Sequence, residues 1–486
     1  MRGIWGRRRT KDEGRFGGCA ETSTRGACAT RNSRRSLRYP AGLSRVSCFS
    51  VGPLFQFARV TAPKKLLVVD IAALGWNLVR HLPEFQPAQS VWPAITCAAQ
   101  ASFRTASNPQ QHGIVANGLF FKDLTKVLFW EQSATLVEGP RIWDKFRARG
   151  GTVGLMFWQQ SMGENVDLIV TPAPIHKHSG GMIQACYTQP ASLEARLNEA
   201  VGRPFNLMNY WGPLANYKSS DWIVNAVISV MGMPDAAPDL LLSYIPHLDY
   251  DLQRHGPDSE EAAKALDILL GYLTRLKAAC NDFGYDWIFV GDYAIESVKR
   301  GAVFPNRALR EAGLFHVRDI RRMAYTDFFT SPAFAVVDHQ IAHVYCRDAK
   351  AIESARTCLQ ALPGVAEVLD REAQSRRGIA HPRSGDLILA AEDGAWFAYP
   401  WFEKTEAPDY ASHVDIHNKP GYDPCELFFG WPPGSVSFDT TKIHGTHGSV
   451  GEGFEIAWTS SLAFDSPPTN LLDLATTTQR WMDTRP

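Results

Sequence analysis

Residues 65–70 read KLLVVD, and this short stretch decides the fold class. Its apolar part, Leu66 to Val69, is continuous rather than alternating, which is typical of a strand buried on both faces of an α/β sheet. Asp70 ends the run, so a carboxylate lies at the carboxyl end of the strand, where open α/β sheets bind their ligands. The stretch predicts a buried parallel strand with a candidate site at its end.

The same pattern recurs further along the chain. Short apolar runs predict strands, and amphipathic segments between them predict helices. The strands are expected over residues 152–157, 240–245 and 287–290, and the helices over 142–149, 192–201, 221–231 and 259–283. Strands that alternate with helices favour a mainly parallel central sheet flanked by helices, an α/β fold.

A second, smaller unit interrupts this pattern. It is predicted from a strand over 333–345, a helix over 349–362 and strands over 365–369 and 386–391. We therefore expect a catalytic core over residues 63–330 and 410–460, an α+β insertion over 331–409, and a loose tail over 461–486, where the patterning is weak.

Residues 1–62 differ from the rest of the chain. They hold 13 basic and three acidic residues, a net charge of +10, whereas the whole chain of 486 residues is neutral. We interpret them as a basic leader that is expected to be disordered. Three readings stay open: an organelle transit peptide, a basic arm for an anionic partner, or a solvated tail or mis-assigned start. The predicted location is cytoplasmic, or organellar if the leader is a transit peptide.

Composition excludes several classes of protein. Hydrophobic residues make up 45% of the chain and charged residues 21%, which is ordinary globular composition. A neutral chain is a poor general binder of nucleic-acid polymers, and no apolar run is long enough to span a membrane. The nine cysteines form no CxxC pair, which favours a reducing compartment.

Thr96 is the first candidate for chemistry. It follows a stiff Trp92-Pro93 turn and precedes the helix-favouring stretch CAAQAS. A hydroxyl at a helix N-terminus is well placed to attack phosphorus, because free N–H groups and the helix dipole stabilise phosphate oxygens. The alternative is that Thr96 only caps the helix.

Residues 111–118, QHGIVANG, complete a wider pattern. A strand ending in Asp, then Trp-Pro-x-x-Thr, then His-Gly-Ile-Val-x-Asn resembles the type I phosphodiesterase and nucleotide pyrophosphatase family of the alkaline phosphatase superfamily. The resemblance extends from about residue 65 to residue 454. It implies an alkaline-phosphatase-like core and a hydrolase of small phosphodiesters, pyrophosphates or phosphonates that acts through a covalent phospho-threonine. It also implies two divalent cations, usually zinc, with manganese or magnesium as alternatives.

The resemblance assigns roles to the first constellation. It implies that Asp70 is a metal ligand, that Thr96 is both nucleophile and bridging ligand, and that Asn117 donates a hydrogen bond to the phosphoryl oxygen. His112 is expected to support the turn.

The second constellation lies within residues 244–257, YIPHLDYDLQRHGP. The family has an Asp and, four residues later, a His on one metal. One register gives Asp249, with Gln253 at the position of the His. The other gives Asp251 and His255 and restores the spacing. We prefer Asp249 and keep the second register open.

The third and fourth constellations supply Asp292 and His447. The resemblance implies an Asp-His pair on the second metal at residues 292–293, so Asp292 fits, whereas Tyr293, a poor zinc ligand, replaces the His of that second site. A late His-Gly pair occurs twice, and His447 is preferred over His444.

Other histidines are candidates to compensate for the missing ligands. His339 and His343 lie four residues apart and would share a face of a strand, with His343 the better candidate for a buried structural role. His413 and His417 alternate around Asp415. We expect His339 or His417 in the site. Trp158 is expected in the core, and Lys419 is expected to be solvated.

Two other functions stay open. The replacements at 253 and 293 allow a non-catalytic or one-metal binding protein on the same fold. A phosphotransferase or mutase of the superfamily is the third possibility. The expected partner is a small phosphoester, and the sequence leaves the oligomeric state open.

Overall fold

The structure, a computed structural model, describes residues 65–179 and 181–484. The leader predicted for residues 1–62 lies outside the described residues. Within the described residues, no helix combines the length and the hydropathy that a bilayer span requires.

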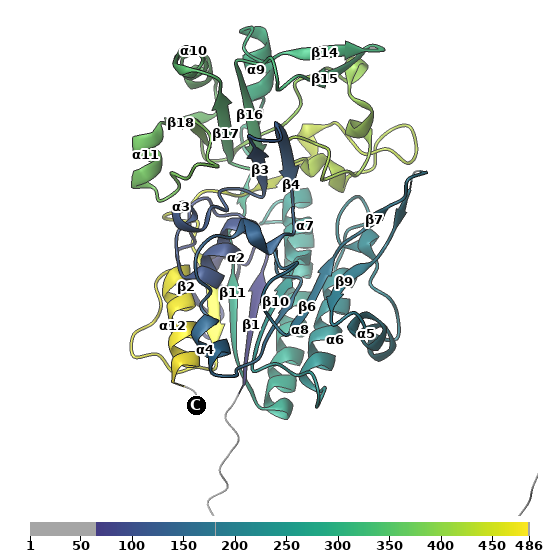
Figure 1. Ribbon diagram of the computed structural model, residues 1–486, viewed down its shortest axis with the longest axis vertical. Helices are drawn as coiled ribbons and strands as arrows, with labels where there is room; N and C mark the ends of the chain where they lie inside the picture. Colours follow the sequence, from purple (N-terminus) through teal and green to yellow (C-terminus); the bar gives the residue numbers. More distant parts are fainter. Residues whose placement is uncertain (1–64, 180, 485–486) are drawn as a thin grey trace, which may run out of the picture. The chain divides into compact units, whose positions relative to one another are not determined.

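An eight-stranded sheet forms the centre of the fold, and its five middle strands are parallel (Figure 1). In spatial order the strands are β2 (Gln86–Ala88), β22 (Ile456–Ser460), β11 (Tyr285–Gly291), β1 (Lys65–Ile71), β10 (Leu240–Ile245), β5 (Val153–Met156), β6 (Leu168–Pro172) and β9 (Cys186–Gln189). The outer strands β22, β2 and β9 pair antiparallel. Leu66 to Ile71 are fully or almost fully buried, so the predicted buried parallel strand is confirmed.

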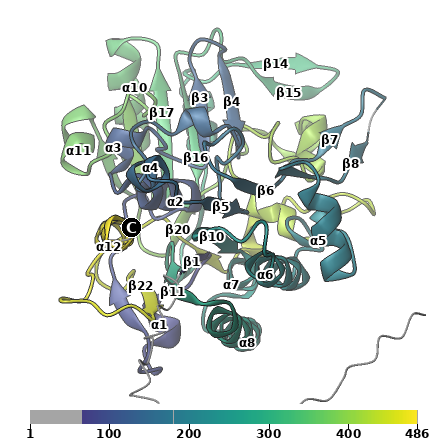
Figure 2. The same ribbon diagram turned by 60° about the horizontal axis from the view of Figure 1, so that its bottom comes forward.

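Helices cover both faces of this sheet (Figure 2). One face packs against α5 (Leu193–Val201), α6 (Lys218–Met231), α7 (His247–His255) and α8 (Glu260–Phe283), and the other against α2 (Thr96–Thr105), α4 (Asp144–Ala148) and α12 (Leu471–Asp483). The longest helix, α8, shows why the sequence predicted it. Ser259 caps it by accepting from the backbone N–H of Ala262, and Gly284 ends it in the left-handed region.

Helix α12 corrects one prediction. The tail expected to be loose from residue 461 is helical over residues 471–483, with Asn470 as its N-cap. Leu471, Leu474 and Met482 are buried beside α2 and α4. Their spacing is helical, but the stretch is too short and too polar elsewhere for the pattern to stand out in the sequence.

A four-stranded antiparallel sheet forms within the predicted insertion. It consists of β16 (Ala333–Asp338), β17 (Ile341–Cys346), β19 (Leu387–Ala391) and β18 (Val365–Leu369), with α10 (Ala349–Gln360) packed on it. The single strand predicted over 333–345 is therefore a hairpin. The core of this sheet also includes Phe129 and Tyr422 from outside the insertion, and the described residues fold as one unit.

The remaining elements are short. They are α1 (Trp76–Val79), α3 (Pro109–His112), α9 (Pro305–Glu311), α11 (Arg371–Arg376), and the strand pairs β3 (Gly118–Phe121) with β4 (Lys126–Phe129), β7 (Ile175–His176) with β8 (Met182–Ile183), β12 (Glu296–Ser297) with β21 (Gly445–Thr446), β13 (Gly301–Val303) with β20 (Ala395–Phe397), and β14 (Val317–Ile320) with β15 (Met323–Thr326).

Candidate active site

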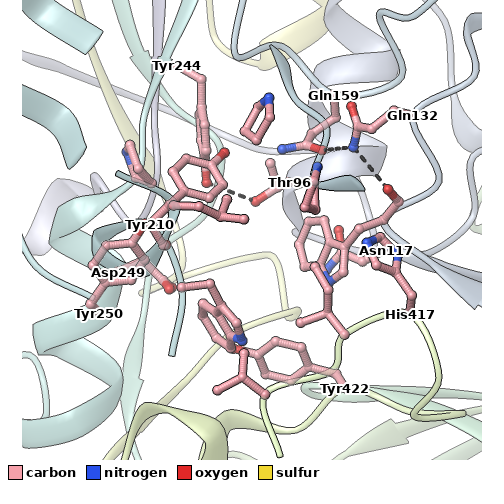
Figure 3. A pocket seen from close by; sticks show the side chains of 18 of the residues that line it. Thr96, Asn117, Gln132, Gln159, Tyr210, Tyr244, Asp249, Tyr250, His417 and Tyr422 are labelled. Carbon is pink, nitrogen blue, oxygen red and sulfur yellow. Dashed lines mark hydrogen bonds between the residues drawn. The ribbon is translucent and has the colours of Figure 1, made fainter. Parts of the chain in front are cut away.

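Thr96 lies in the wall of a cavity of about 330 Å³ that is also lined by residues from the ends of β10 and β11 (Figure 3). It is the first residue of α2, and Ile95 is the N-cap, with an extended backbone and no side-chain capping bond. The Thr96 hydroxyl lies 3.4 Å from the Tyr244 hydroxyl. Thr96 is therefore not the capping residue, and it lines the cavity at the first turn of α2, where the Cys97 N–H is bonded to Asn117.

Two carboxylates lie at the ends of the neighbouring strands β1 and β11. Asp70 and Asp292 are both buried. Gln100 donates to Asp70 Oδ2 at 2.6 Å. Asp292 Oδ1 accepts from the backbone N–H of Ala73 at 3.2 Å and of Tyr293 at 2.9 Å. Its other oxygen, Oδ2, has no hydrogen-bond partner among the described residues.

These two carboxylates oppose each other electrostatically. Burial raises the pKa of Asp70 to about 7, against hydrogen bonds from Gln100 and the Ile71 backbone. Burial and then the charge of Asp70 raise the pKa of Asp292 well above its usual value, while the Thr96 side chain opposes the rise. Two buried carboxylates and a hydroxyl are hard oxygen ligands, and the two carboxylates need a nearby positive charge in order to ionise together. A divalent cation fits such a set.

Asn117 is held in a fixed orientation. Its Oδ1 accepts from the Cys97 backbone N–H at 3.0 Å, and its Nδ2 donates to Asp338 Oδ1 at 3.1 Å. The Asn117 backbone N–H also donates to Asp338 Oδ2, at 2.7 Å. A carboxamide has two N–H bonds, so one is left on the side chain, which lines the cavity with Thr96.

Asp249 lies in the first turn of α7 and is surrounded by donors. Gln253 Nε2 lies 2.9 Å from Oδ1 and 2.7 Å from Oδ2. The Tyr293 hydroxyl donates to Oδ1 at 3.0 Å, and the Tyr422 hydroxyl donates to Gln253 Oε1 at 2.9 Å. Burial raises the pKa of Asp249 to about 6, with the hydrogen bonds from Gln253 and Tyr293 opposing the rise.

The alternative register is not brought to the site. Asp251 pairs with Arg254 at 3.4 Å and is partly exposed, and His255 is exposed. Neither lines the cavity. Two residues correspond to a rotation of about 200° around an α-helix, so a helix that buries Asp249 turns Asp251 away. The second register, with Asp251 and His255 as ligands, is wrong for this cavity.

His447 lies next to Asp249. Its Nδ1 is hydrogen-bonded to the Ala94 carbonyl at 2.9 Å, so Nδ1 carries the proton, and its Nε2 lies 4.0 Å from Asp249 Oδ1. Its ring stacks on Tyr293 at 3.5 Å between centroids. His444, the second choice, is exposed.

His339 occupies the hairpin turn between β16 and β17, with φ +57°. A non-glycine residue in this region is uncommon and marks a constrained position. Its Nδ1 is bonded to Asp338 Oδ1 at 2.8 Å, and its Nε2 has no partner among the described residues. The ring stacks on Tyr422 and lies tilted against His447, with the ring centroids 3.7 Å apart in each pair. Burial lowers the pKa of His339 and of His447 well below the usual value.

The other histidines divide as follows. His417 lines the cavity and donates from Nδ1 to the Phe129 carbonyl at 3.1 Å. His343 is buried and bonded to the Val115 carbonyl at 3.2 Å, a structural role. His112 is bonded to Ser102 at 2.8 Å and supports the turn as predicted, and His413 is exposed.

Lys419 corrects another prediction. It is buried rather than solvated, and its Nζ lies 2.9 Å from Asp423 and 2.7 Å from Glu426. The other carboxylate oxygen of Glu426 accepts from the Trp211 indole at 2.6 Å. This buried network therefore holds a ring that lines the cavity. Trp158 lies in the core, as predicted.

Sequence reasoning missed three residues that complete the site, namely Gln100, Tyr244 and Tyr422. Gln100 had a usable signal, because it lies one helical turn after Thr96 and so shares its face. Tyr244, near the end of β10, had a weaker one. Tyr422 had none, since the fold brings it to Gln253 from far along the chain.

The described residues offer few side chains that could bind a metal ion together. In residues 65–179 and 181–484, no group of three or more His, Cys, Asp or Glu side chains is arranged to hold a metal ion. The two oxygen-rich acids beside Thr96 are the donor set that fits a cation best.

Known proteins resemble this chain in sequence and in fold. A sequence profile of the type I phosphodiesterase / nucleotide pyrophosphatase family matches residues 83–423. A protein of Schizosaccharomyces pombe, described as an uncharacterised pyrophosphatase/phosphodiesterase, is 26% identical over 220 residues. That match covers 44% of this chain and 38% of the relative.

Solved structures share the fold. Murine ectonucleotide pyrophosphatase / phosphodiesterase 5 superposes with a TM-score of 0.52 at 15% identity, over 86% of this chain and 95% of that one. An inactive threonine-to-alanine variant of it has been solved in complex with AMP. Phosphonoacetate hydrolase of Sinorhizobium meliloti, in complex with phosphonoacetate, gives a TM-score of 0.57 at 15% identity, with the same coverage.

Proposed function

The chain belongs to the type I phosphodiesterase/nucleotide pyrophosphatase family of hydrolases, and from this premise we propose that Thr96 is its nucleophile toward small phosphodiesters, pyrophosphates or phosphonates. One observation carries the proposal. The Thr96 hydroxyl opens into the same cavity as the Asn117 amide, at the N-terminus of α2. A nucleophile, a hydrogen-bond donor for a phosphoryl oxygen and a helix N-terminus are thereby combined at one point.

The proposed reaction has two displacements on phosphorus. Thr96 Oγ1 gives up its proton to solvent and forms a bond to phosphorus while the bond to the leaving oxygen, or to carbon in a phosphonate, breaks and the leaving atom takes up a proton from solvent. Water then attacks the phospho-threonine and frees Thr96. Asn117 would donate its remaining N–H to a phosphoryl oxygen as charge develops there, and Tyr244, at 3.4 Å, would orient the attacking hydroxyl.

Divalent-metal dependence is general in this family. We propose that Asp70 and Asp292 hold a cation beside Thr96, with zinc as the first candidate and manganese or magnesium as alternatives. Their raised pKa values and the unpartnered oxygen of Asp292 support this position. When bound, a divalent cation lowers the pKa of a neighbouring hydroxyl and offsets negative charge on phosphoryl oxygens.

The cavity wall supports a substrate with an aromatic or bulky apolar group. Aromatic side chains dominate it, namely Trp130, Tyr210, Trp211, Tyr244, Tyr250, Tyr293 and Tyr422. Gln132 and Gln159, bonded to each other at 2.6 Å, add polar groups on one side (Figure 3). The AMP complex of the murine protein is in line with an aromatic group at such a wall.

Turnover of bis-(p-nitrophenyl) phosphate by the full chain tests the proposal. Thr96→Ala is expected to lower kcat by about 10³-fold or more, whereas Thr96→Ser, which keeps a hydroxyl, retains measurable turnover. Protein quenched in acid during turnover of this diester should carry one p-nitrophenyl phosphoryl group on the peptide that contains Thr96. Unchanged activity in Thr96→Ala would contradict the proposal.

A further inference from the structure

We propose that hydrogen bonds from Gln253 and Tyr293 take the place of a second cation at Asp249, so that the chain binds one divalent cation, between Asp70 and Asp292. The inference rests on the proposed function and specifies its metal requirement. The resemblance to the family implies two cations, and the residues present fit only one of them.

The contacts of Asp249 carry the argument. Both of its oxygens accept from Gln253 Nε2, at 2.9 and 2.7 Å, and Oδ1 also accepts from the Tyr293 hydroxyl at 3.0 Å. The positive charge of Arg254 adds to this stabilisation. A buried carboxylate with three such contacts has its hydrogen-bonding needs largely met.

The orientation of the Gln253 amide is fixed by a third residue. The Tyr422 hydroxyl donates to Gln253 Oε1 at 2.9 Å, which turns Nε2 toward Asp249. The opposite orientation would set the amide oxygen against the carboxylate with no proton between them. In the observed orientation Gln253 presents N–H bonds, and an N–H donor is not a metal ligand.

Tyr293 closes the other side of Asp249. Its hydroxyl binds the carboxylate while its ring lies parallel to the His447 ring, at an interplanar angle of 3°. The His339 ring lies tilted against His447 at 3.7 Å between centroids, so His447 is packed against two aromatic rings. Neutral phenols are poor ligands for zinc, and this stack fixes the imidazole without any need for metal.

The carboxylate pair at Asp70 and Asp292 lacks this closure. Asp292 Oδ2 has no partner among the described residues, and the charge of Asp70 raises the cost of ionising Asp292. No hydrogen-bond donor bridges the two acids among the contacts of the described residues. Asp70 and Asp292 are therefore the carboxylates that need a cation, whereas Asp249 does not.

Metal counting tests the inference without relying on activity. Full-length protein is equilibrated with Zn²⁺ alone, dialysed and analysed for metal, and the counts are repeated with Mn²⁺, which does not favour thiolates. We expect one equivalent in the wild type and none in Asp292→Asn. The double variant Gln253→His/Tyr293→His supplies imidazoles and removes both donors, and its zinc count is expected to rise to two.

Controls separate the possible outcomes. Gln110→His adds an imidazole at an exposed position and should leave the count at one. Thermal melting of each variant confirms that it is folded. Two equivalents or none in the wild type would overturn the inference, and so would a folded double variant that stays at one. Loss of the proposed function is read separately, from turnover in Thr96→Ala.

Discussion

Asp292 and Asp249 are two buried carboxylates of the site that are stabilised in different ways, and of the two only Asp249 lines the cavity. Asp292 is buried beside a second carboxylate, and one of its oxygens has no partner among the described residues. Asp249 is equally buried but receives three contacts from Gln253 and Tyr293. A buried carboxylate needs a cation or a set of donors, and this chain uses a different remedy at each place.

The difference shows which neighbouring residue types decide whether a buried carboxylate is stabilised by a cation or by hydrogen-bond donors. At Asp292 the neighbours are another acid, backbone N–H groups and the Thr96 hydroxyl, so the charge stays uncompensated. At Asp249 an amide stands where the family pattern has an imidazole, and the phenol of Tyr293, which replaces the His beside Asp292, also donates to this carboxylate. Two side chains are enough to change a ligand position into a hydrogen-bonded one.

We call Asp292, with its unpartnered oxygen, the open position and Asp249 the closed position. The largest expected effect comes from a substitution at the open position. Asp292→Asn should lower phosphoesterase turnover by at least about 100-fold, because it removes charge next to the nucleophile at the reacting centre. Asp249→Asn is the matched change at the closed position and should cost less than about 10-fold, because asparagine keeps an oxygen for Tyr293. Turnover of bis-(p-nitrophenyl) phosphate measures both, and equal losses would contradict the comparison.

The pH dependence of the free energy of unfolding should distinguish the carboxylate pair at Asp70 and Asp292 from Asp249. Because the pKa of Asp70 is raised from 3.8 to about 7, the folded state holds its proton more tightly than the unfolded state. The free energy of unfolding of chelator-treated protein should therefore fall as pH rises from about 4 to about 7, by up to about 1.4 kcal/mol per unit. Urea unfolding at each pH measures this fall.

Two variants assign that slope. Asp70→Asn removes the carboxyl group whose pKa is raised by burial and should flatten the fall over the same window. Saturating Mn²⁺ should also flatten it, since the cation binds the ionised form. Asp249→Asn should remove only the smaller part due to Asp249, whose pKa is about 6. A profile of the wild type with no fall would contradict the raised pKa of Asp70.

The sequence predicted the open position better than the closed one. Asp70, Thr96 and Asp292 lie at ends of strands or at the start of a helix, and such positions follow from apolar runs and breaks in them. The central strands and the helices from α2 to α8 that were expected are present for the same reason.

The closed position was only half visible from the sequence. The replacements Gln253 and Tyr293 could be read, but the hydrogen bond from Tyr422 depends on the fold of a distant loop. His339 was missed as a turn residue because the run around it reads as one strand. Lys419 was expected in solvent because it lies in a turn-rich stretch, although Asp423 is four residues further along and pairs with it, as does the more distant Glu426.

Removing the amide tests how firmly the closed position is held. Gln253→Ala leaves the Tyr422 hydroxyl without its acceptor and Asp249 Oδ2 without its donor, so the free energy of unfolding should fall by about 1–3 kcal/mol. Gln110→Ala, an exposed change of the same kind, should fall within about 0.5 kcal/mol of the wild type. Urea unfolding in the presence of chelator measures both, and an unchanged Gln253→Ala would mean that water replaces the amide.

The smallest change isolates the phenol. Tyr293→Phe keeps the ring that stacks on His447 and removes only the hydrogen bond to Asp249, so the free energy of unfolding should fall by about 0.5–1.5 kcal/mol. Gln253 still contacts both carboxylate oxygens, and the zinc count should therefore remain at one. A second equivalent of zinc in this variant would mean that the Tyr293 hydroxyl alone excludes the second cation. Gln253 would then have turned its amide oxygen toward the metal and lost the hydrogen bond from Tyr422.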